Sequence, residues 1–305
     1  MRLEWPHLPP HVRALVERRI GGEVVDAQTR DSGFSNGFAS VLTRADGSRH
    51  FVKGASVKAQ RGAASSYRAE AMVLPALPDG VPSPRMTWQH DDDEWVLLGL
   101  EYVDGAAPAR PWRGADLDRC LDALELLAEA GAAGLDGLEL TRFAEDFVDG
   151  PAAWDVVRSR GTLDAPETLL AEAAERAAGF AEVTDGDTLV HTDLRDDNLL
   201  LTPGGAQMVD WSWPALGAAW VDSVLLLVGP RADGVPVDDL LTGRPLTRDV
   251  PADAVDALLA LVAGVQLKSA GDRPPPASPY LREHQRVLGE AAWGWLAERR
   301  GWPPA

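Results

Sequence analysis

The pattern of apolar and polar positions near the start of the chain predicts one helix followed by a small antiparallel sheet. Apolar residues at helical spacing favour a helix at about 10–20, and two β-like stretches follow at roughly 23–30 and 38–44. Turn residues at 46–48 lead from the second stretch into a third one at 49–53. Two β-like stretches joined by such a turn are typical of a hairpin, so we expect neighbouring antiparallel strands.

The pattern changes twice more before the chain becomes mainly helical. Helical spacing of apolar residues predicts a helix at about 61–77, and three prolines between 78 and 84 then turn the chain. Residues 95–103 form a nearly continuous apolar run, which predicts a buried strand. We place the end of an N-terminal domain at residue 103.

Helical periodicity dominates the second part of the chain. Ala- and Leu-rich segments separated by proline or glycine predict helices at about 115–132, 165–182, 252–268 and 280–299. The strong β signals of this part bracket residues 188–210. A sheet followed by helices indicates the α+β class, with an N-terminal antiparallel-sheet domain of residues 1–103 and a mainly helical domain of residues 104–305.

Length and composition are those of a globular protein with a real core. The chain has 305 residues, of which 45% are hydrophobic. No run of about 18 apolar residues is present to span a bilayer, and the N-terminus carries charges where a signal peptide needs an apolar stretch. We therefore expect a cytoplasmic protein without a membrane partner. A monomer is the default expectation for its oligomeric state.

Charge and cysteine content narrow the possible partners. With 29 basic and 47 acidic residues the formal net charge is −18, which argues against nucleic-acid binding because phosphate groups repel an acidic surface. The same charge favours cationic partners, although solubility alone also explains it. The single cysteine, Cys120, cannot form an internal disulfide, and we predict a helix core residue rather than a nucleophile.

One polar loop carries groups that phosphate chemistry requires. It lies between short apolar stretches, and a hairpin then delivers Asp210 at the end of another apolar strand, so Asp193, Asn198 and Asp210 are expected around one point. Phosphoryl transfer from ATP needs a carboxylate to orient the attacking hydroxyl, oxygen ligands for Mg²⁺, and cations beside the phosphates. The loop supplies the first two.

The spacing of these residues also resembles that of a known family. His191-x-Asp193-x4-Asn198, followed twelve residues later by Asp210, is similar to the catalytic and metal-binding loops of the aminoglycoside phosphotransferase family, relatives of the protein kinases. The resemblance implies a two-lobed, protein-kinase-like fold that binds ATP and Mg²⁺. It further implies that Asp193 is the catalytic base, that Asn198 and Asp210 bind Mg²⁺, and that His191 is a structural anchor.

Two residues of the N-terminal domain extend the resemblance. Lys53, one of three lysines in the chain, ends the third predicted strand, where a kinase lysine contacts the α- and β-phosphates. Glu70 lies seventeen residues later on the next predicted helix, where a kinase glutamate holds that lysine. Each residue alone would be a solvated surface charge, but together with the downstream loop they indicate a nucleotide-binding pair.

Two further segments are predicted to contact the nucleotide. Gly33, Ser35 and Asn36 lie between two predicted strands, where glycine lets the backbone approach phosphates and polar groups donate hydrogen bonds. A plain hairpin turn is the alternative for this segment. Glu101 and Val103 are similar in position to the interlobe hinge of the family, whose backbone meets the adenine edge.

Residues beside the loop both support and weaken the resemblance. Asp222 resembles the buried aspartate that braces the catalytic loop of the family. Thr192 stands where the family often has glycine, and Ser212 where an acidic residue is common. Arg195 lies two residues after the predicted base, where a guanidinium would offset charge that develops during transfer; a salt bridge to the aspartates at 196–197 is the alternative.

The reading that combines these features is a small-molecule kinase. It would transfer the γ-phosphate of ATP to a hydroxyl group of a small, amine-bearing acceptor such as an aminoglycoside, with recognition by the helical domain. A metabolic kinase for a sugar or an amino alcohol is the first alternative, because fold does not fix substrate. A nucleotide-binding regulator with little turnover is the second.

Overall fold

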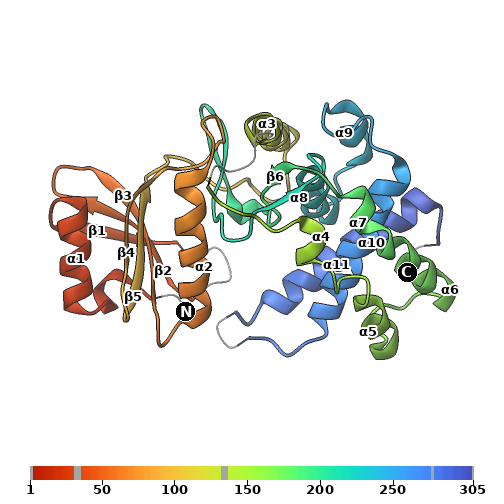
Figure 1. Cartoon of the computed structure of the whole chain (residues 1–305), viewed down its shortest axis with the longest axis horizontal. Helices are drawn as coiled ribbons and strands as arrows, with labels where there is room; N and C mark the ends of the chain where they lie inside the picture. The colour runs from red at the N-terminus through yellow and green to blue at the C-terminus, as the bar shows by residue number, and fades with distance from the viewer. Residues whose placement is uncertain (1–2, 31–35, 132–136, 276–277, 304–305) are drawn as a thin grey trace.

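The N-terminal part of the protein is a five-stranded antiparallel sheet. The computed structural model describes residues 3–30, 36–131, 137–275 and 278–303 (Figure 1). Across the sheet the strands follow the order β1 (Val24–Thr29), β2 (Phe38–Arg44), β3 (Arg49–Ser56), β5 (Trp95–Glu101) and β4 (Met86–Asp91). The predicted strands and the β2–β3 hairpin are therefore confirmed.

One helix covers each face of this sheet (Figure 1). Helix α1 (Pro10–Ile20) packs in a cluster that includes Leu97, and helix α2 (Arg61–Val73) lies over the face to which Val96 and Leu98 belong. Successive side chains of a strand point to opposite faces, so the apolar run of β5 supplies both clusters. This double burial explains why β5 reads as continuously apolar.

Strand β4 and the end of α2 differ from the sequence prediction. β4 lies at the edge of the sheet, and its residues alternate between half-buried and exposed, so it lacks the apolar run of an inner strand. The predicted helix at 61–77 ends at Val73 and continues as a 3₁₀ turn, Leu74–Ala76. Pro75 has no N–H to donate to the preceding turn, which ends the α-helix there.

The C-terminal part is a bundle of helices around α10 (Figure 1). The helices are α3 (Gly114–Gly131), α4 (Phe143–Asp146), α5 (Ala153–Arg160), α6 (Glu167–Ala178), α7 (Phe180–Val183), α8 (Val221–Ala232), α9 (Asp238–Gly243), α10 (Ala252–Ala270) and α11 (Leu281–Arg300). Helix α10 packs against α5, α6, α7, α8 and α11. The fully buried Trp154 of α5 donates its indole N–H to the Ala260 carbonyl oxygen at 3.0 Å.

Three of the four predicted helices of this part are confirmed, and the fourth is divided. The segment at 165–182 forms α6 and α7, separated at Gly179. Helix α8 was not predicted. Its buried residues lie on all sides of the helix, and a helix that is apolar all round gives no amphipathic pattern.

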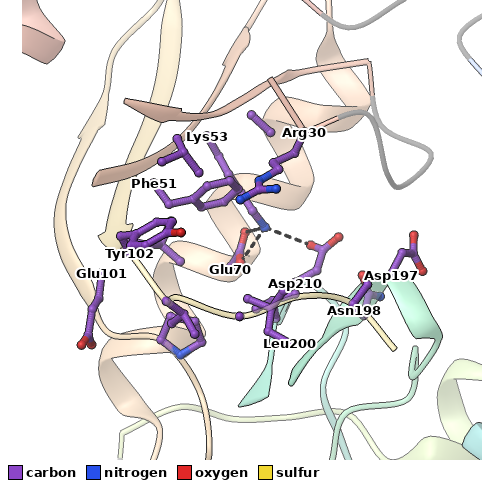
Figure 2. A pocket seen from close by; sticks show the side chains of 18 of the residues that line it. Arg30, Phe51, Lys53, Glu70, Glu101, Tyr102, Asp197, Asn198, Leu200 and Asp210 are labelled. Carbon is purple, nitrogen blue, oxygen red and sulfur yellow. Dashed lines mark hydrogen bonds and ion pairs between the residues drawn. The ribbon is translucent and has the colours of Figure 1, made fainter. Parts of the chain in front are cut away.

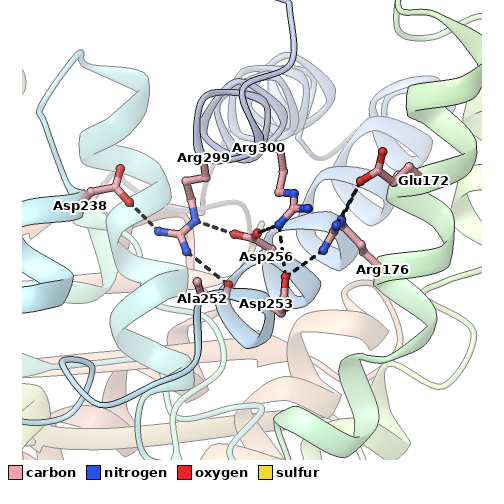
Figure 3. A network of polar contacts seen from close by, with 8 residues as sticks. All are labelled: Glu172, Arg176, Asp238, Ala252, Asp253, Asp256, Arg299 and Arg300. Atoms are coloured by element: carbon pink, nitrogen blue, oxygen red, sulfur yellow. Dashed lines mark hydrogen bonds and ion pairs between the residues drawn. The ribbon is translucent and has the colours of Figure 1, made fainter.

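An ion-pair network joins four of these helices (Figure 3). Arg299 of α11 donates to Asp256 of α10 and to Asp238 of α9, each at 2.6 Å. One turn away on α10, Asp253 lies 3.2 Å from the guanidinium of Arg176 on α6. The network therefore fixes the last helix of the chain to the rest of the bundle.

Two short antiparallel strand pairs carry the polar loop. Strand β6 (Thr188–Val190) pairs with β9 (Ala215–Gly217), and β7 (Leu199–Thr202) pairs with β8 (Gly205–Met208). The loop between β6 and β7 and the segment after β8 consequently meet beside the sheet.

The domain boundary after Val103 stays a prediction. Among the described residues, no helix is long and apolar enough to cross a membrane.

Candidate active site

A buried carboxylate holds the start of the polar loop. Asp222, in the first turn of α8, accepts the backbone N–H of His191 at 2.6 Å and that of Thr192 at 2.9 Å. The ring of His191 lies 3.1 Å from the Val209 carbonyl oxygen. Burial lowers the pKa of His191, so its ring stays neutral at pH 7. Asp222 thus braces the loop as predicted, and the contacts of His191 are those of an anchor.

The backbone conformation at Thr192 shows why glycine would suit this position. Its φ is 67°, in the left-handed region that glycine enters without strain. Here the Thr192 hydroxyl donates to the Trp213 carbonyl oxygen at 2.6 Å, which offsets part of that strain. Asp210 also has a left-handed φ, 70°, and accepts a 2.9 Å hydrogen bond from the Ser212 hydroxyl. Thr192 and Ser212, the two residues that differ from the family pattern, are therefore both held in the site by hydrogen bonds.

The predicted base and one predicted metal ligand lie side by side. The amide nitrogen of buried Asn198 donates to the backbone oxygen of Asp193 at 2.8 Å and to its carboxylate at 3.2 Å. Arg195 donates to the same carboxylate and, at 2.9 Å, to Asp197. Burial raises the pKa of Asp193, and the adjacent Arg195 opposes that shift. The predicted alternative, a salt bridge from Arg195 to a neighbouring aspartate, is therefore present at Asp197.

Lys53 connects the sheet to the loop region. Its ammonium group lies 2.8 Å from both carboxylate oxygens of fully buried Glu70 on α2, and 3.5 Å from Asp210 (Figure 2). Asp210 and Glu70 raise the pKa of Lys53 more than burial lowers it, so the lysine is cationic. Lys53 in turn lowers the pKa of Asp210, which is ionised at neutral pH. Lys53 and Glu70, which the sequence predicted as a pair, therefore lie together beside Asp210, one of the predicted metal ligands.

Lys53, Glu70, Asn198 and Asp210 line one cavity of about 280 Å³ between the sheet and the loop region (Figure 2), whereas Asp193 and Arg195 do not belong to its lining. Its wall combines the charged residues with an apolar surface from both parts of the chain, formed by Val41, Phe51, Leu100, Leu200 and Val209. Glu101 and Val103 also line it, and the carboxylate of Glu101 points away from Lys53 (Figure 2). Such a cavity can hold a flat apolar group beside a strongly charged one.

The predicted phosphate-covering segment is only partly described. Gly33 and Ser35 lie outside the described residues. The backbone oxygen of Asn36 accepts a hydrogen bond from the Gln60 side chain, and Asn36 is not among the residues that line the cavity. The segment is thus tied to the start of α2 at Asn36.

The comparison that decides the family concerns most of the chain. The sequence profile of the phosphotransferase enzyme family matches residues 26–252. The chain belongs to this family. No curated protein matches this chain.

Solved structures show that the fold extends over nearly the whole chain. A thermostable mutant of aminoglycoside phosphotransferase APH(4)-Ia, in complex with AMP-PNP and hygromycin B, is 14% identical over 95% of this chain and 98% of its own, with a TM-score of 0.63. An aminoglycoside phosphotransferase from Alicyclobacillus acidocaldarius is 17% identical, with 96% of each chain covered and a TM-score of 0.60. Choline kinase LicA from Streptococcus pneumoniae is 14% identical, covering 92% and 98%, with a TM-score of 0.60. At these identities the similarity establishes the kinase-like fold alone.

The structure also brings to the cavity and the loop charged residues that were not predicted from the sequence. Arg30, at the end of β1, directs its guanidinium into the cavity near Lys53 (Figure 2). The sequence signal that could have identified Arg30 is a basic residue at the end of a predicted strand, next to a glycine-containing segment. Arg110 and Asp233 pair beside the loop, and no local pattern relates them because they are 123 residues apart.

The donor set of the cavity fits a magnesium ion. Within the described part of the chain, no group of three or more His, Cys, Asp or Glu side chains is arranged to hold a metal. Magnesium usually takes only one or two protein ligands and keeps its waters. The amide nitrogen of Asn198 binds Asp193, which leaves the amide oxygen on the opposite side of the group; with the Asp210 carboxylate it forms such a pair.

Proposed function

We propose that this phosphotransferase transfers the γ-phosphate of ATP to a hydroxyl group of a small, amine-bearing molecule. The observation that carries the proposal is the position of Lys53, held by Glu70 and only 3.5 Å from Asp210, in a cavity that Asn198 also lines. A fixed ammonium group beside hard oxygen ligands suits a metal-bound triphosphate. Solved neighbours bind ADP or AMP-PNP, one of them with Ca²⁺, which supports a nucleotide in this cavity.

Each residue has a role in this proposal. The apolar wall that includes Phe51 and Leu100 holds the adenine, with the backbone of Glu101 to Val103 at its edge. Arg30 and Lys53 supply positive charge for the phosphates. The nucleotide-binding lobe would then comprise residues 1–103 and the catalytic, acceptor-binding lobe residues 104–305.

Asp193 orients the acceptor hydroxyl and accepts its proton. Burial raises its pKa toward the range of a useful base, and the adjacent Arg195 opposes that rise. Asn198 fixes the position of that carboxylate through its amide nitrogen. Asn198 and Asp210 would hold Mg²⁺, which when bound neutralises charge on the phosphates. Arg195, bound to Asp193, lies where it would offset charge near the transferred group.

The acceptor is proposed to carry an amine because the protein is strongly acidic, with a net charge of −18. The neighbouring structures support a small polar acceptor: one holds hygromycin B, and another is a choline kinase. Both compounds carry positive charge and hydroxyl groups.

The test is ADP release with MgATP and a panel of aminoglycosides, simple sugars and amino alcohols. Asp193→Asn should lower kcat about 100- to 10,000-fold, the usual contribution of a general base, while ATP binding measured by calorimetry is kept. Asp210→Ala should abolish both magnesium dependence and transfer. Asp155→Asn, an exposed carboxylate of α5, serves as the control and should retain parental activity.

Other outcomes would redirect the proposal. Turnover only with a sugar or an uncharged alcohol would contradict the amine-bearing acceptor but keep the kinase. Binding of ATP without transfer to any compound would contradict the kinase and favour a regulator. Full activity of Asp210→Ala would refute the metal assignment.

A further inference from the structure

A second charged cluster lies directly beside the predicted base. Arg110, on the segment between β5 and α3, makes a two-pronged ion pair with Asp233 after α8, with its Nε 2.8 Å and its Nη2 2.5 Å from the two carboxylate oxygens. The backbone N–H of Trp112 donates to the same carboxylate at 3.2 Å. A third guanidinium nitrogen of Arg110 lies 3.6 Å from Asp196, in the loop that carries Asp193.

Two arginines neutralise half of the negative charge around Asp193. Four carboxylates, of Asp193, Asp196, Asp197 and Asp233, face two guanidinium groups, of Arg110 and Arg195. Arg110 takes both oxygens of Asp233, and Arg195 takes Asp197. If Asp193 serves the reacting hydroxyl, the one carboxylate left with only a distant partner is Asp196, whose side chain is 26% exposed.

The first turn of α11 borders the same surface. His284 interacts electrostatically with Arg195, Asp196, Asp197 and Arg110. Burial, and then Arg195, lowers the pKa of His284, so its ring is neutral at pH 7. His284 therefore adds a polar but uncharged group to this surface. The negative charge available to an acceptor remains that of Asp196.

We propose that Arg110 determines acceptor specificity by occupying Asp233 and leaving Asp196 accessible, so that the acceptor carries a single amine near its reacting hydroxyl rather than several. This inference rests on the proposed function and narrows its acceptor to a monoamine such as an amino alcohol or a sugar with one amino group. A polyamine would have to displace Arg110 from a carboxylate that is only 14% exposed. Removing one partner of such a pair leaves a charge without its bidentate hydrogen bonds.

The experiment compares Arg110→Ala with a matched control, Arg68→Ala. Arg68 makes an equally close two-pronged pair with Asp91 between α2 and β4, so both variants lose one positive charge and one bidentate pair. The probes are glucosamine, with one amine, and kanamycin, with several. Binding to the protein with AMP-PNP and Mg²⁺ is measured by calorimetry, and kcat/KM is measured with ATP.

The parent and Arg68→Ala should favour glucosamine over kanamycin. Arg110→Ala should raise the affinity and kcat/KM for kanamycin relative to glucosamine by about 10- to 100-fold, the value of one charge-assisted hydrogen-bonding partner made available. A second variant, Asp196→Asn, should weaken glucosamine binding by about 10-fold without improving kanamycin.

Two results would overturn the inference: a parental preference for kanamycin, or the same change in ratio for Arg68→Ala as for Arg110→Ala. Failure of the proposed function is distinguishable, because it appears as loss of transfer to every probe. In that case the calorimetric ratios still decide the role of Arg110, since they do not depend on turnover.

Discussion

Cys120 shows how burial alone decides the chemistry of one side chain. It lies on α3 with no exposed surface, and burial raises the pKa of its thiol to about 12 from an ordinary value of 9.0. The thiolate is the reactive form of cysteine. At pH 8, DTNB should therefore react at least about 100-fold more slowly with the native protein than with the chain unfolded in guanidinium. Equal rates would contradict the predicted core position.

The same shift fixes the direction of a pH effect on stability. The folded state keeps the Cys120 thiol protonated where the unfolded chain already ionises, because its pKa is the higher one. The contribution is complete below pH 9 and is lost as the pH rises from about 9 toward 12. The free energy of unfolding, measured in urea, should consequently fall faster with pH above 9 in the parent than in Cys120→Ala.

At the scale of elements, the attachment of α11 depends on one buried carboxylate. Asp256 is 2% exposed and binds Arg299 at 2.6 Å, whereas Asp253 on the same helix is 79% exposed. Asp256→Ala should lower the free energy of unfolding by about 2–3 kcal/mol, because it leaves a half-buried guanidinium short of a partner. Asp253→Ala should change it by less than about 1 kcal/mol, since exposed pairs contribute little.

Urea denaturation with unchanged m-values measures both variants. The comparison separates burial from charge, because each substitution removes one carboxylate from the network of Figure 3. A loss of stability as large for Asp253→Ala as for Asp256→Ala would show that net charge, rather than burial, governs this network.

At the scale of the whole molecule, a net charge of −18 should attract a cationic acceptor. Salt screens such attraction, with a Debye length of about 8 Å at physiological ionic strength. Raising NaCl from about 50 mM to about 500 mM should lower kcat/KM for an amine-bearing acceptor several-fold. An uncharged polyol acceptor in the same assay controls for general salt effects, and an equal decline for both would contradict electrostatic attraction.

Much of the site was predictable because its residues follow local rules. Lys53 lies in a strand with a clear hairpin pattern, and Glu70 follows at a fixed spacing on an amphipathic helix, so their pairing at 2.8 Å agrees with the prediction. Asp193, Asn198 and Asp210 lie on one short loop and the hairpin after it. Edge strand β4 and helix α8 were missed, because one has few apolar residues and the other is apolar all round.

The sequence by itself determined the order of the elements, the α+β class and the loop on which the proposed chemistry depends, since periodicity and motif spacing are properties of neighbouring residues. Only the tertiary structure decided that Asp222 holds the loop at His191, and that Arg110 pairs with Asp233 and lies near Asp196. These partners are separated by 31, 123 and 86 residues along the chain. Contacts between such distant residues leave no local pattern; packing of the helices and the sheet brings them together.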